Sequence, residues 1–313
     1  MPLSTPALAL ALAATVVGVA VFSLGVRGIW RTVAVGGPAA RGDHPGRRTW
    51  LTFTTLLGHG RFRHRPMVRV AHWVVMVSFP ILFLTLASAY GQLVDPRFTL
   101  PLVGRWAPLE VLTEVIAWLS LVGIVALIVL RQVSHPRRGA AAAGRPSAAR
   151  TDDDVRHGPP GARASRFFGS NMGQAYLVEA VVLVVVVAVL VLRGLEHALE
   201  ISPTVGGATQ LASPGAALQP FTPGHYPLTA WFGQWFAAWP VERIESAIVL
   251  VALAKILASM TWMVVVGLRP AMGVSWHRFL AVVNVWARRE VDGRPALGPV
   301  PPVRAGGTGG GAV

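Results

Sequence analysis

The stretch VVLVVVVAVLVL, residues Val181–Leu192, decides the fold class of this chain. Its β-branched residues would favour a strand in water, but it lacks the apolar–polar alternation of a membrane-spanning strand. In lipid an isolated strand leaves its backbone N–H and C=O groups without partners, whereas a helix satisfies them internally. The stretch is therefore predicted to be part of a membrane-spanning helix.

Four further segments are also long, apolar stretches. Each is long enough to cross a bilayer, because a span needs about 20 mostly apolar residues. The composition agrees, because 13% of the residues are charged, against roughly 25% in soluble domains. We therefore predict an all-α integral membrane protein with a bundle of five transmembrane helices. The predicted spans are Leu8–Trp30, Met67–Tyr90, Leu109–Leu130, Gly173–Leu195 and Ile244–Leu268.

The distribution of arginine predicts the orientation of the spans. The first connection and its flanks hold nine arginines (27–69), the third connection eight (131–166) and the C-terminal region six (269–304). The second and fourth connections share only four: Arg97, Arg105, Arg193 and Arg243. Because short cytoplasmic loops are enriched in Lys and Arg, we expect the N-terminus outside, the C-terminus in the cytoplasm, and a multi-pass protein of the plasma membrane.

The segments outside the spans differ in composition. Residues 1–300 are expected to form one membrane domain, with a disordered cytoplasmic loop at 139–164 and a flexible tail at 301–313. The segment HYPLTAWFGQWFAAW (225–239) could form an amphipathic helix at the interface. The first span lacks the basic beginning of a cleavable signal peptide.

The residue types restrict the possible chemistry. The chain has no cysteine, so it is expected to hold no iron–sulfur cluster and no thiolate metal site. Its net charge of +14 would suit nucleic acid, but membrane topology explains where the basic residues lie, and we expect no nucleic-acid binding.

Two histidines are the candidate ligands of a haem iron. His72 lies near the inner end of the second span, and His277 follows the inner end of the fifth. An ionisable side chain inside a membrane helix is a functional candidate, and two neutral imidazoles suit the axial positions of a haem. Arg69 and Arg278 are placed to pair with its propionates.

Other readings of the histidines remain open. An interfacial histidine beside tryptophan can simply anchor the helix at the interface. His59 and His64 have a spacing that suits a metal, although a solvated basic loop is the simpler reading. His197 and His225, on the outer side, could ligate a second haem.

Lys255 lies near the middle of the fifth span, where a charge costs about 2.5–3.5 kcal/mol. It could form an ion pair with Glu114, Glu245 or Glu179. It could also contact a quinone carbonyl or belong to a proton path. No catalytic residue is assigned.

The layout and several segments resemble known membrane proteins. The five spans, the histidine of the second span and WHRFLAVVNVWARRE (276–290) resemble the cytochrome b-type gamma subunit of respiratory nitrate reductase. GHGRFRHRPMVRVAHWVVMVSF, YGQLVDPRFTLPLVGRW, RFFGSNMGQAYLVEA and GLRPAMGVSWHRFLAVVNVWARRE more closely resemble the membrane domain of actinobacterial iron–sulfur-binding reductases, which is similar to heterodisulfide reductase membrane subunits. The resemblance covers roughly residues 15–300.

This resemblance implies an oxidoreductase subunit of the respiratory chain that is not a complete enzyme alone. It would carry haem b, with His72 and His277 as ligands, and pass electrons between menaquinone and cytoplasmic iron–sulfur centres. The nitrate reductase subunit has a second ligand pair, whereas Val74–Tyr90 and Ile244–Leu268 contain no histidine here, which favours one haem over two.

The chain also departs from these relatives, because they continue into a cysteine-rich domain. A separate iron–sulfur subunit, or a split or truncated gene, would account for the difference. Two alternatives are a haem-free anchor or assembly subunit, whose basic face docks a partner or anionic lipid, and a transporter or channel with Lys255 at a site in the middle of the membrane.

Overall fold

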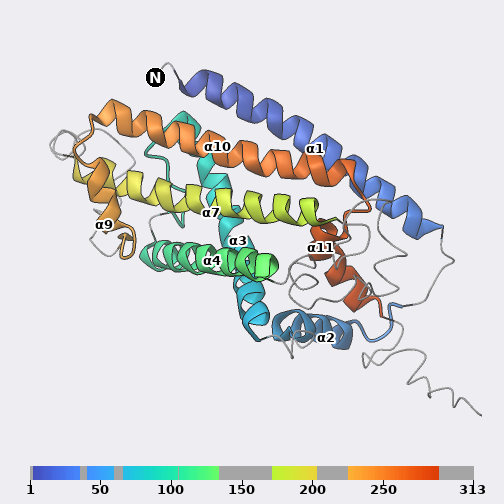
Figure 1. The fold of residues 1–313 in the computed structure, drawn as a ribbon. Helices are drawn as coiled ribbons and strands as arrows, with labels where there is room; N and C mark the ends of the chain where they lie inside the picture. Colours follow the sequence, from blue (N-terminus) through green and yellow to red (C-terminus); the bar gives the residue numbers. More distant parts are fainter. Residues whose placement is uncertain are drawn as a thin grey trace, which may run out of the picture. The chain divides into compact units, whose positions relative to one another are not determined.

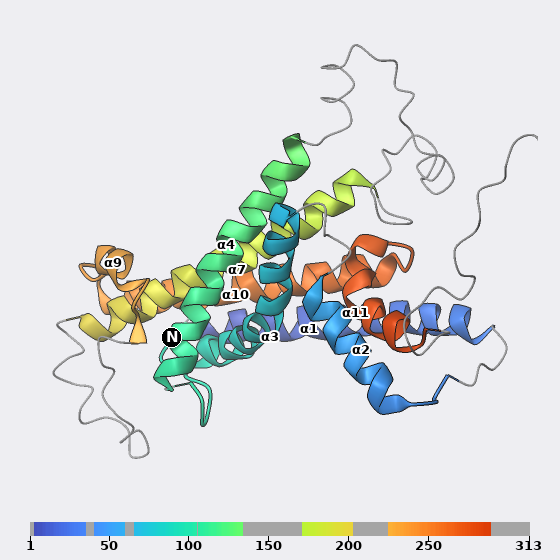
Figure 2. The same ribbon diagram turned by 90° about the horizontal axis from the view of Figure 1, so that it is seen from below.

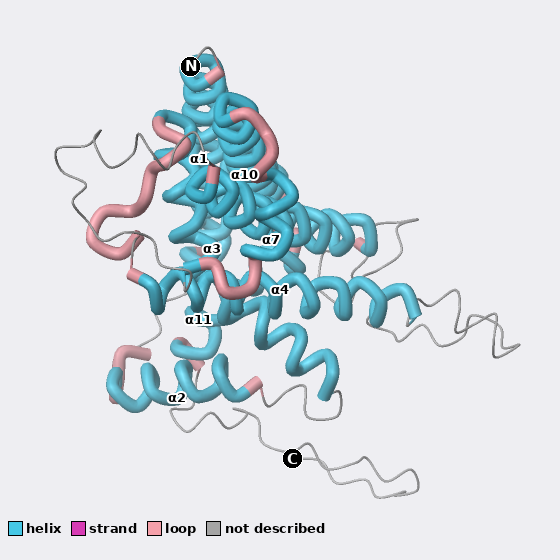
Figure 3. Tube along the Cα trace, turned by 90° about the vertical axis from the view of Figure 1, so that its left-hand side faces the viewer, coloured by secondary structure: helices cyan, strands magenta, loops and turns pink. Residues whose placement is uncertain are grey.

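A computed structural model describes residues 3–35, 41–59, 66–104, 106–133, 171–202 and 225–288. These residues are largely helical and include no β-strand (Figures 1 and 3). The helices are α1 (Ser4–Ala34), α2 (Pro45–Gly58), α3 (Pro66–Val94), α4 (Ala107–Val133), α7 (Met172–Ile201), α9 (Ala230–Gly233), the 3₁₀ helix η3 (Gln234–Phe236), α10 (Val241–Leu268) and α11 (Gly273–Trp286).

Five of these helices, α1, α3, α4, α7 and α10, are long and apolar enough to cross a membrane. This confirms the prediction of an all-helical, multi-pass membrane protein. Each helix contains its predicted span and extends beyond it at one or both ends, because a helix can continue past the apolar core of the bilayer. Large apolar side chains such as Val16, Leu24 and Val122 are exposed on these helices, as expected of a surface that faces lipid.

Local sequence explains where several helices begin. The Asn171 side chain accepts a hydrogen bond from the Gln174 N–H, and the Gln174 side chain accepts one from the Asn171 N–H. This capping box fixes the start of α7. Proline occupies the first position of α2 and α3, where its missing N–H costs nothing.

The chain divides into two compact units. The first comprises residues 1–35 and 61–276 and holds all five spanning helices. The second comprises residues 36–60 and 277–313, so it contains α2 and most of α11.

In the first unit, α1 and α10 lie side by side (Figures 1 and 2). Glycines allow this close approach, because they stand where the two helices pack. A Cβ atom on Gly25 would lie 2.7 Å from the carbonyl oxygen of Gly267, and one on Gly18 would lie 3.2 Å from Met260 Sδ. Gly18 and Gly25 are seven residues apart, so they share one face of α1. Small residues on one face let membrane helices approach closely.

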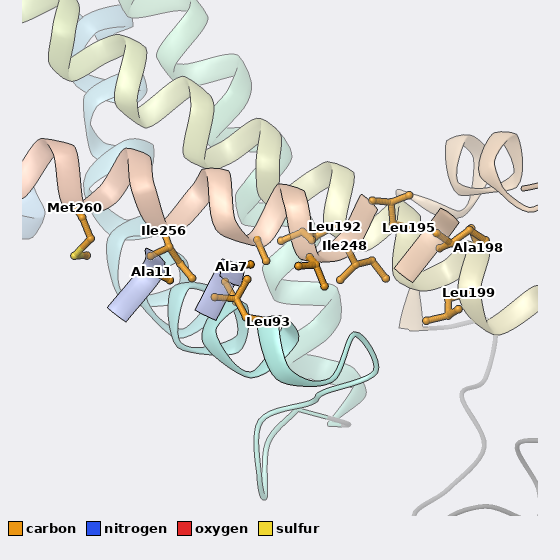
Figure 4. Close-up of a cluster of buried hydrophobic side chains, with 14 residues drawn as sticks. Ala7, Ala11, Leu93, Leu192, Leu195, Ala198, Leu199, Ile248, Ile256 and Met260 are labelled. Atoms are coloured by element: carbon orange, nitrogen blue, oxygen red, sulfur yellow. The ribbon is translucent and has the colours of Figure 1, made fainter. Parts of the chain in front are cut away.

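The main apolar core of this unit is formed by α1, α3, α7 and α10 (Figure 4). A second apolar cluster joins α3, α4 and α7. The fully buried members of the main core include Ala11, Ala89, Leu93, Ile244, Ile248, Ala252 and Ile256.

The second unit is organised by Arg48, which is 3% exposed. Its guanidinium donates to the backbone oxygens of Trp286 and Arg288 and forms an ion pair with Asp43. The Trp286 indole N–H donates to Thr49 Oγ1 at 3.2 Å. The bonds to Trp286 and Arg288 join α2 to the end of α11. The hydrogen bond and charge of Arg48 lower the pKa of the Asp43 carboxyl below its usual value.

Two segments outside the spans differ from the sequence reading. The predicted interfacial helix at 225–239 is broken into α9 and η3, because α9 packs against the end of α7 rather than continuing along one apolar face. His59 ends α2 and is buried, so the solvated-loop reading is wrong for this residue. His64 and the segments 139–164 and 301–313 lie outside the described residues.

Candidate functional site

The end of α7 carries ionisable residues on one face. Arg193, Glu196 and Glu200 follow one another at spacings of three and four residues, which places their side chains on the same side of the helix. They lie at the end of the unit where α3 and α7 end and α4 and α10 begin. The arginine distribution predicts that this end faces outside, and we call it the predicted outer end.

Arg193 is the hub of a charged cluster. Its guanidinium forms ion pairs with Glu196 at 2.9 Å, Glu114 at 3.3 Å and Glu110 at 3.7 Å. It also donates a hydrogen bond to the backbone oxygen of His225. The other carboxylate oxygen of Glu110 forms a hydrogen bond with His225 Nδ1. We call Glu110, Glu114, Arg193, Glu196, Glu200 and His225 the Arg193 cluster.

Glu114 connects this cluster to the loop before α9. Its carboxylate is fully buried and accepts hydrogen bonds from the Leu228 N–H, at 2.8 Å, and from the Thr229 hydroxyl. Packing supports the same junction, because a Cβ on Gly194 would lie 2.3 Å from the Phe232 ring. Glycine at this position therefore allows α9 to lie against α7.

Tyr226 extends the cluster on the same face of α7. Its hydroxyl donates to Glu200 at 2.8 Å, and its ring lies 4.2 Å from the Arg193 guanidinium carbon. Burial, together with the nearby carboxylates of Glu196 and Glu200, raises the pKa of Tyr226 well above its ordinary value. The hydroxyl is therefore protonated at neutral pH and acts as a donor.

The cluster as a whole contains more acidic than basic groups. Four carboxyl groups are grouped with one guanidinium and one imidazole. Burying an unpaired carboxylate is costly, and such a group is usually neutralised by a proton. This arrangement is suited to binding and exchanging protons.

Lys255 lies deeper in the same unit, at the middle of α10. It is fully buried, and its ammonium donates to the Thr85 carbonyl oxygen of α3 at 2.7 Å. Among the described residues it forms no ion pair within 4.0 Å. It does interact electrostatically with Glu196.

The ion-pair alternatives for Lys255 are therefore wrong. Each of the three carboxylates considered from sequence binds an arginine instead. Glu114 pairs with Arg193, Glu245 with Arg97 at 3.1 Å, and Glu179 with Arg131 at 2.7 Å.

The predicted haem ligands lie on separate parts of the chain. His72 is partly buried in α3, six residues after the helix begins, and Arg69 is exposed one turn earlier. His277 and Arg278 are partly buried in α11 and belong to the second unit. The pairing of the two imidazoles stays a prediction from sequence.

A haem and a bare metal ion need different sets of protein donors. No group of three or more His, Cys, Asp or Glu side chains that could hold a metal occurs among the described residues. Haem iron takes its equatorial ligands from the porphyrin and needs only axial side chains, so two imidazoles are sufficient.

The two outer histidines have other surroundings. His225 is buried in the Arg193 cluster and bonded to Glu110. His197 packs its ring edge-on against Tyr226, with ring centroids 5.3 Å apart. A Cβ on Gly233 would lie 2.8 Å from His197 Nδ1, so α9 covers this nitrogen closely.

Sequence reasoning treated Arg193 only as one of four arginines near the outer connections, and it missed the cluster. Two signals were present. One is the spacing of Arg193, Glu196 and Glu200 on one helix face, and the other is the four-residue spacing of Glu110 and Glu114. The contacts that join the residues of α7 to those of α4 link positions about 80 residues apart in the chain. No local sequence pattern predicts such contacts.

Comparison of the chain with models of known protein families, with curated proteins and with solved structures finds no match in any of the three.

Proposed function

We propose that the protein is an electron-transfer subunit of the plasma membrane that carries one b-type haem. It would pass electrons between menaquinone, dissolved in the bilayer, and a cytoplasmic iron–sulfur oxidoreductase. The observation that carries the proposal is the position of His72. Its imidazole is partly buried in a spanning helix, roughly 9 Å along the axis from the first residue of α3, where an ionisable group is costly and functional by default.

In this proposal each residue has a separate task. His72 and His277 hold the haem, and Arg69 and Arg278 pair with its propionates. When bound, the haem supplies one-electron chemistry that no side chain of this cysteine-free chain can supply. The protein provides ligation, orientation and an apolar environment.

Lys255 is proposed to act on the quinone or on its protons. Its fully buried ammonium has three donors, one of which is bound to Thr85. A donor at this depth could bind a quinone carbonyl or move a proton. The buried apolar residues of α3 and α10 in the main core, among them Ala89, Ala252 and Ile256, would exclude bulk water.

The proposed cytoplasmic partner would dock on the arginine-rich connections. These connections and the C-terminal region hold most of the 28 basic residues, and anionic lipid headgroups would meet the same basic surface. The partner would supply the cysteine-ligated clusters that this chain lacks.

The test is reduction by a menaquinol analogue in proteoliposomes, followed by the visible α-band of a b-type haem. We expect the band to appear in the wild-type protein. Lys255→Leu should retain the haem but slow its reduction, and Ser246→Ala, on the outer part of the same helix, should behave as wild type.

Two outcomes would contradict the proposal. A haem-containing wild-type protein that is not reduced by the quinol would refute quinone-linked electron transfer. A colourless protein, expressed with adequate haem, would favour the haem-free anchor.

A further inference from the structure

The charge balance of the Arg193 cluster requires bound protons. Its four carboxyl groups share one guanidinium, and His225 adds at most one further positive charge. Glu110 and Glu114 are buried, and both belong to a membrane-spanning helix. Because a low dielectric penalises unpaired charge, some of these carboxyl groups hold protons.

Gln92 gives independent evidence of a hydrogen-bond donor inside the cluster. Its side chain is 2% exposed and directed at Glu196, to which its Nε2 donates. Its Oε1 has no hydrogen-bond partner among the described residues. A buried amide oxygen requires a donor. If the amide is turned over, Oε1 faces the Glu196 carboxyl group. Because Oε1 can only accept a hydrogen bond, Glu196 must then carry a proton and donate it.

Lys255 and Gln92 are linked through one face of α3. Lys255 contacts Thr85, and Gln92 follows Thr85 by seven residues, or two turns. The two contacts are therefore about 10 Å apart along the helix axis. The residues between them on α3 and α10 include Ala89 and Ala252, whose small side chains are fully buried.

An interval of about 10 Å can be bridged by roughly two or three waters at hydrogen-bond spacing. Lys255 has donors beyond the one bound to Thr85, and Gln92 Oε1 is an acceptor at the other end. Buried waters characteristically link such unsatisfied polar groups.

We propose that Lys255, Gln92 and the Arg193 cluster form a proton-transfer path from the middle of the membrane to the predicted outer end, with Glu196 as the proton-accepting group. In each transfer the Lys255 ammonium loses a proton through bridging water and becomes a neutral amine. The Glu196 carboxylate gains that proton and becomes a neutral carboxylic acid. No electron moves in this step.

The path itself depends only on the residues named, whereas its use in quinol chemistry rests on the proposed function. Oxidation of a quinol releases protons together with electrons. Lys255 would accept those protons, and Glu196 would pass them to Glu110, Glu200 and Tyr226 at the predicted outer end. The electrons would leave in the opposite direction.

The first experiment does not require haem. Purified protein in lipid nanodiscs is exposed to a pH change, and infrared difference spectra record the C=O stretch of protonated carboxyl groups in H₂O and D₂O. We expect a band that shifts in D₂O, is lost in Glu196→Gln and changes in Lys255→Met. Glu242→Gln, an exposed carboxylate on α10, is the matched control and should leave the band unchanged.

Absence of the band in the wild-type protein, or its persistence unchanged in both Glu196→Gln and Lys255→Met, would overturn the path. Thermal unfolding of each variant shows whether it is folded, and Glu196→Asp, which keeps the carboxyl group, should retain a band.

The second experiment measures quinol-driven haem reduction in the same variants. Loss of a positioned proton acceptor should slow the reaction by roughly 100-fold in Glu196→Gln, with unchanged haem content, and a normal rate would overturn the path. If the wild-type protein contains no haem, the proposed function fails, and the infrared result alone decides the proton path.

Discussion

Replacing Arg193 by glutamine should destabilise the predicted outer end more than any other single arginine substitution there. The change removes ion pairs to Glu114 and Glu196 and the hydrogen bond to the His225 backbone oxygen. Glutamine has neither the charge nor the number of donors to replace these contacts.

The magnitude follows from burial. Arg193 is 8% exposed and Glu114 is fully buried, so solvent cannot compensate the carboxylate that remains. Removing one partner of a buried pair typically costs about 3–5 kcal/mol. We therefore expect Arg193→Gln to lose unfolding free energy of this size. The loss is smaller if Glu114 takes up a proton, because the carboxyl group then carries no buried charge.

The assay is reversible unfolding in mixed micelles by titration with a denaturing detergent. Arg243→Gln is the matched control, because Arg243 is exposed, its guanidinium lies 4.2 Å from the Trp239 ring, and it forms no ion pair within 4.0 Å among the described residues. An exposed cation–π contact is worth about 0.5–1 kcal/mol, and the control should lose no more than this.

The double variant Arg193→Gln with Glu114→Gln identifies the cause. Removing the unpaired carboxylate should restore part of the stability, with a coupling energy of about 0.5–3 kcal/mol. If Arg193→Gln unfolds within about 0.5 kcal/mol of wild type, the reasoning about the buried hub is refuted.

Three further predictions concern other parts of the chain. Gly267→Ala places a Cβ 2.5 Å from the Val21 carbonyl oxygen and should cost about 1–3 kcal/mol in unfolding free energy; Gly28→Ala, with its nearest atom at 3.9 Å, should cost nothing, and equal effects would contradict the close helix packing. Arg48→Gln removes the donors to the end of α11, so amide hydrogen exchange should accelerate in the last turn of α11, and unchanged protection would contradict this role. Tyr226 has a folded-state pKa above its unfolded value of 10.0, so the stability it contributes is present below about pH 10 and is lost as the pH rises through the folded pKa. Phenolate absorbance should show a late-titrating component that disappears in Tyr226→Phe, and an identical titration curve in that variant would contradict the prediction.

The spanning helices could be predicted because the signal for them is local. An apolar run of about 20 residues is sufficient, and the run at Val181–Leu192 falls inside α7. The helix ends extend further than predicted, because polar caps such as Asn171 rather than the apolar boundary fix where α7 begins.

The remaining contacts could not be read from the sequence because they join distant residues. Glu114 lies in the second turn of α4, and it binds Arg193, 79 residues away, together with the loop at Leu228. Lys255 instead uses the Thr85 carbonyl oxygen, and backbone acceptors carry no sequence signature. The helices α2 and α11 are too short to give a hydropathy signal.

The central claim is tested most directly by the haem content per chain of the purified protein, measured from reduced-minus-oxidised spectra. We predict about one b-type haem per chain in the wild type and its loss in His72→Ala and in His277→Ala. His44→Ala, an exposed histidine beside α2, should retain the haem. Full haem content in His72→Ala, or a colourless wild-type protein made with adequate haem supply, would contradict the account.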